Sequence, residues 1–141
     1  MDHFLAPEHR ELTVRTAGMF VELGQSRHPD PALSIADHVG AEALEDADLV
    51  TEYLDHGYLL IDMMDVEPDV LDPGQELLNG SSIRTDGDWL WRQDLAYYVR
   101  RHHVALPPEL LATIRERRYA VPPVDEARLI ALTASAEHFA F

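Results

Sequence analysis

The order of apolar and polar residues predicts five helices, the first of them over residues 7–24. In that segment the apolar positions and one threonine fall on one helical face, and Gly24 can end the helix in the left-handed conformation. The residues of this face are Leu12, Thr16, Met19, Phe20 and Leu23.

The second predicted helix spans residues 45–57. Its apolar residues share one face, acids crowd the first turn, where the helix dipole favours them, and Gly57 follows the last turn. The residues of this face are Ala47, Val50, Tyr53 and Leu54. Before it, Ser34 and Gly40 enclose a segment that predicts one additional short helix capped by the serine.

Three more helices are predicted in the C-terminal third of the chain. Each has its own start signal, either an aspartate that can cap the first turn or a proline pair. The segments are residues 95–103 after Asp94, residues 109–118 after Pro107 and Pro108, and residues 126–137 after Asp125.

The apolar period changes at Tyr58, where a continuous apolar run predicts a buried strand over residues 58–64. Residues 67–80 contain Pro and Gly turn signals and many acids, which favour a long loop. Residues 81–85 and 88–91 enclose Asp86 and Gly87, and this pair is typical of a two-residue hairpin turn.

A two-residue turn fixes the register of the predicted hairpin. Thr85 then faces Asp88, Arg84 faces Trp89, and Ile83 faces Leu90. Trp89 and Trp91 fall on one face and Leu90 on the other, so we expect other parts of the protein, or a second copy, to cover both faces. We interpret the two tryptophans as core residues. Burial stabilises the fold by about 25 cal/mol per Å² of apolar surface, which amounts to several kcal/mol for each tryptophan.

Together these elements predict an α+β fold in one domain over residues 1–141. The expected sheet is small and antiparallel, with about three strands (58–64, 81–85 and 88–91) packed by about five helices. The length of 141 residues suits one domain, and a hydrophobic share of 46% indicates a folded chain.

Composition narrows the possible functions. The chain has no cysteine, which excludes disulfides, thiolate nucleophiles and cysteine-based metal sites. No signal peptide or long apolar run is visible, so we expect a cytoplasmic protein that does not enter a membrane. The net charge of -15 disfavours binding to nucleic acid and to anionic membranes.

The charge is also unevenly distributed along the chain. Between Arg27 and Arg84 there is no Arg or Lys, whereas this stretch contains a run of Asp and Glu residues. Arginines are instead concentrated between Arg92 and Arg118. We expect the carboxylates between the second helix and the hairpin to form one negative face that attracts a cationic partner.

Motifs for catalysis or metal binding are missing. None of the 8 histidines lies in an H-E-x-x-H or H-x-x-E-H motif, and no serine lies in a G-x-S-x-G motif. The acids from Asp62 to Asp72 are suitable ligands for Ca²⁺ or Mg²⁺ but lack the order of an EF-hand loop, which leaves a weak cation site open. We therefore predict no enzyme activity, no catalytic residues, no metal site and no cofactor.

One segment resembles a family. Residues 80–114, GSSIRTDGDWLWRQDLAYYVRRHHVALPPELLATI, contain a Thr-Asp-Gly turn, a Trp-x-Trp strand, a Tyr-Tyr helix and a Leu-Pro helix start. This run resembles small acidic bacterial proteins of the polymorphic-toxin immunity type. The resemblance covers about a quarter of the chain and implies a cationic toxin, such as a nuclease, as the partner.

These observations predict an intracellular protein-binding module that covers a basic protein with an acidic surface. The predicted partner-binding residues are Tyr58, Asp62, Asp65, Glu67, Asp69, Val70, Leu71, Asp72 and Glu76, with Leu77 as a further apolar anchor. The alternatives are a small enzyme or ligand-binding domain that uses carboxylates and a histidine such as His102 in a cleft, and a homodimeric structural protein. Both a monomer and a homodimer are compatible with the sequence.

Overall fold

The computed structural model describes residues 14–25 and 27–141 and has a mixed α and β fold. A four-stranded sheet has the order β1-β6-β5-β2, and a separate two-stranded sheet consists of β3 and β4. The strands are β1 (Arg15–Ala17), β2 (Tyr58–Ile61), β3 (Val66–Asp69), β4 (Asp72–Leu78), β5 (Ile83–Thr85) and β6 (Trp89–Arg92). The prediction of about three strands was therefore too low.

The described chain has four α-helices and one 3-10 helix, whereas five helices and one additional short helix were predicted. They are the 3-10 helix η2 (Ile35–His38) and the α-helices α2 (Ala47–Asp55), α3 (Leu95–His102), α4 (Pro108–Glu116) and α5 (Glu126–Ala140). Their start signals mostly act as expected: the side chain of Ser34 caps η2, Pro108 opens α4, and the Asp125 side chain accepts a hydrogen bond from the Arg128 backbone N–H. Asp94 precedes α3 without capping it, because its carboxylate pairs with Arg92.

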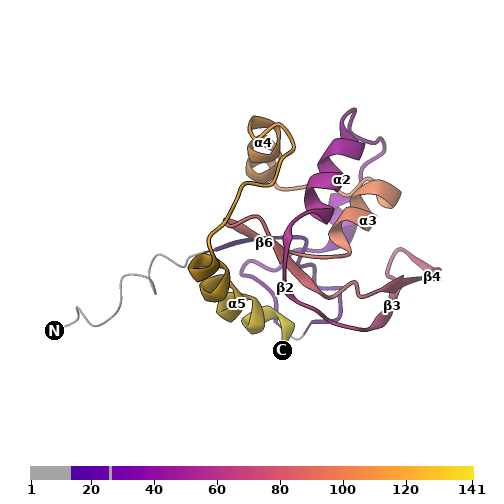
Figure 1. The fold of residues 1–141 in the computed structure, drawn as a ribbon. Coiled ribbons are helices and arrows are strands. Elements are labelled where there is room, and N and C mark those ends of the chain that lie inside the picture. The colour runs from indigo at the N-terminus through magenta and orange to yellow at the C-terminus, as the bar shows by residue number, and fades with distance from the viewer. Residues whose placement is uncertain (1–13, 26) are drawn as a thin grey trace.

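Helices cover both faces of the four-stranded sheet, with α2, α3 and α4 on one side and α5 on the other (Figure 1). Trp89 and Trp91 pack with Tyr53 and other residues of α2, α3 and α4. Ile83 and Leu90 pack on the opposite side with Ala136 of α5. The prediction that both faces of the hairpin are covered is confirmed, and the cover comes from the same chain.

The predicted helix over residues 7–24 is wrong over its described part. From Val14 onward the chain forms β1, which pairs in parallel with β6, and then a turn over residues 21–24. The apolar residues are buried but not on one face, since Met19 packs near α5 while Phe20 and Leu23 join a different cluster. Residues 7–13 lie outside the described residues.

The aromatic hairpin exists, but the predicted register is wrong by two residues. Thr85 pairs with Leu90, Arg84 with Trp91, and Ile83 with Arg92. Side chains stabilise a longer turn: one carboxylate oxygen of Asp86 accepts hydrogen bonds from the backbone N–H groups of Asp88 and Trp89, at 3.0 and 2.9 Å. A shift of two residues leaves every side chain on its predicted face, because strands alternate with a period of two.

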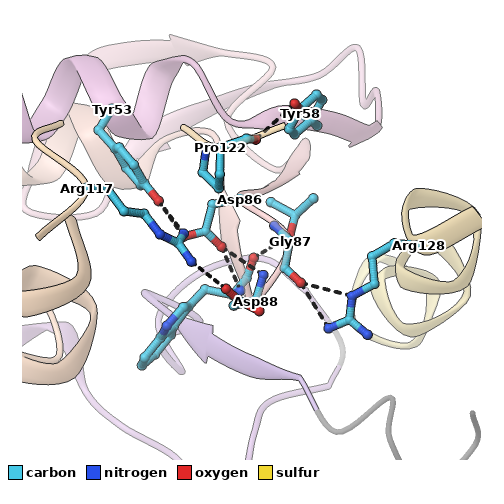
Figure 2. Close-up of polar contacts among 10 residues, drawn as sticks. Tyr53, Tyr58, Asp86, Gly87, Asp88, Arg117, Pro122 and Arg128 are labelled. Atoms are coloured by element: carbon cyan, nitrogen blue, oxygen red, sulfur yellow. Dashed lines mark hydrogen bonds and ion pairs between the residues drawn. The ribbon is translucent and has the colours of Figure 1, made fainter. Parts of the chain in front are cut away.

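Arginines from the C-terminal helical region hold this turn in place (Figure 2). Arg117 pairs with Asp86 at 3.2 Å and with Asp88 at 2.7 Å, and it also donates to the Tyr53 hydroxyl. Arg128 donates two hydrogen bonds to the carbonyl of Gly87, at 3.0 and 3.1 Å. The turn is thereby tied to α2, to the end of α4 and to α5.

Two further predictions in the middle of the chain need correction. The strand predicted over residues 58–64 ends at Ile61, and β2 is only partly buried. Residues 67–80, predicted as a loop, contain most of the hairpin of β3 and β4, which we call the acidic ribbon. Its turn is closed by the Asp69 carboxylate, which accepts hydrogen bonds from the backbone N–H groups of Leu71 and Asp72. Within the described chain, no helix combines the length and the hydropathy needed to cross a membrane.

Candidate protein-binding surface

The acidic ribbon has one outward face that is apolar at the end farthest from the turn. Val66 pairs with Leu78 and Pro68 with Glu76, and directly opposed residues of an antiparallel pair point to the same side. All four are exposed, Val66 at 56% and Leu78 at 70%. Met64, two residues before Val66, is 88% exposed, so three large apolar side chains lie in water on the ribbon or just before it.

The opposite face of the ribbon packs onto the protein. Leu77 is 9% exposed and joins a cluster with Phe20, Ile35 and Tyr98. Val70 and Leu71, at the turn of the ribbon, are half-buried against the same cluster. These three residues, predicted as apolar anchors for a partner, therefore contact the core of their own chain.

Asp69 is the main anchor of the ribbon and is fully buried. One carboxylate oxygen accepts from the Tyr97 hydroxyl at 2.8 Å and lies 2.6 Å from Nε2 of His102, both on α3. Burial opposes ionisation of this carboxyl, but the hydrogen bonds from His102 and Tyr97 outweigh it and hold the pKa of Asp69 below its ordinary value. Asp69 is thus an ionised structural residue.

Other predicted acids make internal contacts as well. Asp72 pairs with Arg101 at 3.1 Å, and Glu67 pairs with Arg92 at 2.9 Å. One oxygen of Asp65 accepts a hydrogen bond from the Ser81 hydroxyl. These contacts, together with those of Asp69, fix the ribbon on the body of the protein and fix the direction in which its outward face points.

The remaining predicted residues, Tyr58, Asp62 and Glu76, do not take part in the contacts that fix the ribbon. The Tyr58 hydroxyl donates to the Pro122 carbonyl at 3.0 Å (Figure 2) and accepts from the Val124 backbone N–H at 3.3 Å. Asp62 and Glu76 are exposed, and no described residue forms an ion pair or hydrogen bond with their side chains. Of these two acids, Glu76 lies on the outward face opposite Pro68, and Asp62 lies two residues before Met64 in the chain.

The expected single negative face is not formed. Arginines of the C-terminal half neutralise several of its acids, as in the pairs of Asp46 with Arg115 and of Asp55 with Arg100. Between Arg27 and Arg84, the acids with no partner among the described residues lie in three places: on the ribbon or just before it, along the exposed side of α2 and the segment before it, and at Asp30 and Asp37 near η2. The second group consists of Glu42, Glu45, Asp48 and Glu52.

Sequence reasoning missed the three exposed apolar residues. A signal was present, since Met64, Asp65, Val66 and Glu67 alternate between apolar and acidic, which is typical of a strand with two different faces. In this ribbon the usual orientation is reversed. Asp65 and Glu67 meet partners on the protein, while Met64 and Val66 face the solvent.

Across residues 14–25 and 27–141, no group of three or more His, Asp and Glu side chains is arranged to hold a metal ion. The candidate site is therefore a surface whose exposed apolar residues and unpaired acids suit contact with another protein. No protein-family model, curated protein or solved structure matches this chain.

Proposed function

We propose that this chain is a protein-binding module of the immunity or antitoxin type, which neutralises a basic toxin by covering it. The observation that supports this most is the outward face of the acidic ribbon. It combines exposed Met64, Val66 and Leu78 with Asp62 and Glu76, whose charges no described residue compensates. Apolar anchors bordered by charges are the usual composition of a binding surface.

The two kinds of residue have different roles in this proposal. The net charge of -15 attracts a cationic partner over a distance and raises the rate of encounter. The apolar side chains are buried in the complex and slow its dissociation. The internal contacts of Asp69 and Asp72 keep the ribbon in one position, which lowers the entropy lost on binding.

The resemblance of residues 80–114 to immunity-type proteins suggests the class of partner. A nuclease toxin has a positively charged active site that binds phosphate, and carboxylates can occupy such a site. Asp62 and Glu76 are available for that contact, because they make none within the described chain.

The test compares two matched surface changes, each of which replaces an exposed apolar residue by aspartate. The immobilised protein is exposed to a lysate of its native host at low and high salt, and each captured protein is then purified and its Kd measured by calorimetry. We expect one basic protein, bound more weakly at high salt, whose binding is lost in Leu78→Asp and kept in Ile130→Asp. Ile130 is the matched control, since it is 65% exposed on α5. Capture of no basic protein, or equal loss in both variants, contradicts the proposal.

A second candidate, a small enzyme or ligand-binding domain, is favoured by one observation. His102 lies against the buried carboxylate of Asp69, and an aspartate beside a histidine is the arrangement that orients a general base. A thermal-shift panel of metabolites and divalent metals tests it, because a ligand at a hundred times its Kd stabilises the protein by about 2.7 kcal/mol. A ligand whose effect disappears in His102→Ala supports this candidate, and a panel without any shift contradicts it.

A further inference from the structure

A small cavity lies beside Asp65, between the acidic ribbon, β5, β6 and the end of α5. Its volume is about 120 Å³, and its polar lining includes Gln25, Asp65, Glu67, Ser81 and Arg92. Its apolar lining includes Met19, Ile83 and Phe139. We call this cavity the Asp65 pocket.

The pocket has carboxylate oxygens with no donor. Oδ1 of Asp65 is buried and accepts no hydrogen bond from any described residue, while its other oxygen accepts from Ser81. Glu67 uses one oxygen for Arg92, and no described residue donates to the other. A buried carboxylate oxygen without a donor is costly, so it favours a ligand that brings one.

Arg92 already uses four of its five N–H groups on other partners. Its Nε and Nη2 atoms donate to the two oxygens of Asp94 at 3.1 and 2.8 Å, Nη2 also donates to Glu67, and Nη1 donates to Gln25. The neighbourhood contains the carboxylates of Asp65, Glu67 and Asp94 and one guanidinium. Burial raises the pKa of Asp94 to about 6, with Glu67 and Asp65 adding to the rise and Arg92 opposing it. The pocket is therefore short of positive charge.

We propose that the Asp65 pocket takes the cationic head group of one lysine or arginine side chain from the basic partner. This inference rests on the proposed function and adds the kind of residue that the partner inserts. An ammonium or guanidinium group brings both the hydrogen-bond donors and the charge that the pocket lacks. The apolar lining suits the methylene stem of either side chain.

The position of the pocket in the chain agrees with the proposed surface. Asp65 lies between Met64 and Val66, two of the exposed apolar residues. Its backbone carbonyl accepts from the Asn79 N–H at 2.8 Å, which fixes this part of the ribbon. The side chain of Asp65 points to the opposite side from those of Met64 and Val66, so a partner on the outward face would reach the pocket with a long side chain that passes the edge of the ribbon.

The test uses small cations in place of the partner. n-Butylguanidinium and n-butylammonium are titrated into the full chain at low salt, and backbone amide shifts are followed by NMR. We expect saturable shifts at Asp65, Glu67 and Ser81. We also expect Asp65→Asn to weaken binding about tenfold, since a hydrogen bond to a charged group is lost. Asp48→Asn, an equal charge change on an exposed residue of α2, should leave the Kd unchanged.

A second variant and a control cation keep the inference open to contradiction. Glu67→Gln replaces Asp65→Asn if that variant does not fold. Tetramethylammonium, which has the charge but no donor, should not saturate. Absence of saturable shifts, equal weakening in Asp48→Asn, or equal binding of tetramethylammonium would overturn the inference.

The two proposals fail separately. If the butyl cations do not bind but a basic protein is still captured through Leu78, only the Asp65 pocket is wrongly assigned. If the cations bind but no basic protein is captured, the pocket remains a cation site and the protein-binding function is contradicted.

Discussion

Nε2 of His102 lies 2.6 Å from Oδ2 of Asp69, whose side chain is 0% exposed, and this contact joins the last turn of α3 to the turn of the acidic ribbon. The two residues are distant in the chain, yet they determine where the ribbon sits. Because the ribbon presents the proposed binding surface, a contact on its buried side controls the geometry of its exposed side.

The Asp69 contact predicts a specific dependence of stability on pH. The pKa of Asp69 is lowered in the folded state, so its contribution is fully present above the unfolded pKa of about 3.9 and is lost as the pH falls through the folded pKa. Urea unfolding of wild type should show this loss below about pH 4, and Asp69→Asn should show a smaller one. Asp62→Asn serves as the control, and a curve like that of Asp69→Asn in this variant contradicts the assignment.

Removing the histidine tests the same anchor at neutral pH. His102→Ala leaves the buried Asp69 carboxylate with one donor fewer, which should lower the free energy of unfolding by about 1–3 kcal/mol. Amide hydrogen exchange should rise first at Val70, Leu71 and Asp72, which form the turn of the ribbon. A uniform rise over the whole chain, with no preference for the turn, would argue against a local anchor.

The helices could be predicted because their signals are local. In α2 the spacing of Val50, Tyr53 and Leu54 matches the buried face, and Pro108 and Asp125 mark the starts of α4 and α5. The faces of the aromatic hairpin were also predictable, because alternation survives a register shift of two residues.

The N-terminal strand and the acidic ribbon could not be predicted, because partners distant in sequence determine them. Residues 15–17 become a strand by pairing with β6, which overrides a helical spacing of apolar residues. The acids of the ribbon face the protein because His102 and Arg101 of α3 and Arg92 of β6 receive them. When these partners are not known, a segment with so many acids indicates a solvent-exposed loop.

Two arginines that bind the ribbon acids should differ sharply in their effect on stability. Arg92 is buried and holds Asp94 and Glu67, so Arg92→Met leaves buried charge unpaired and should cost about 3–5 kcal/mol. Arg101 is half exposed in its pair with Asp72, so Arg101→Met should cost less than about 1 kcal/mol. Urea unfolding of both variants measures the change in the free energy of unfolding. Equal decreases in the two variants would contradict the larger contribution assigned to the contacts of Arg92.

The hairpin turn should not tolerate a side chain at Gly87. This residue has a φ of +104°, and an added Cβ would lie 2.9 Å from Cγ2 of Val124. Gly87→Ala should therefore cost about 1–3 kcal/mol. Gly74→Ala is the control, since the nearest atom to its Cβ is 3.7 Å away, and it should stay within about 0.5 kcal/mol of wild type. If Gly87→Ala left the free energy of unfolding unchanged, the turn would have another conformation in solution.

Adjacent leucines of β4 test which face of the acidic ribbon points outward. Leu77 is 9% exposed and Leu78 is 70% exposed. Leu77→Ala should lower the free energy of unfolding by about 2–5 kcal/mol, because it leaves a cavity in the core. Leu78→Ala should change it by less than about 0.5 kcal/mol. A reversed result in urea unfolding would place Val66 and Leu78 inside, and the proposed binding surface would then lose its apolar anchors.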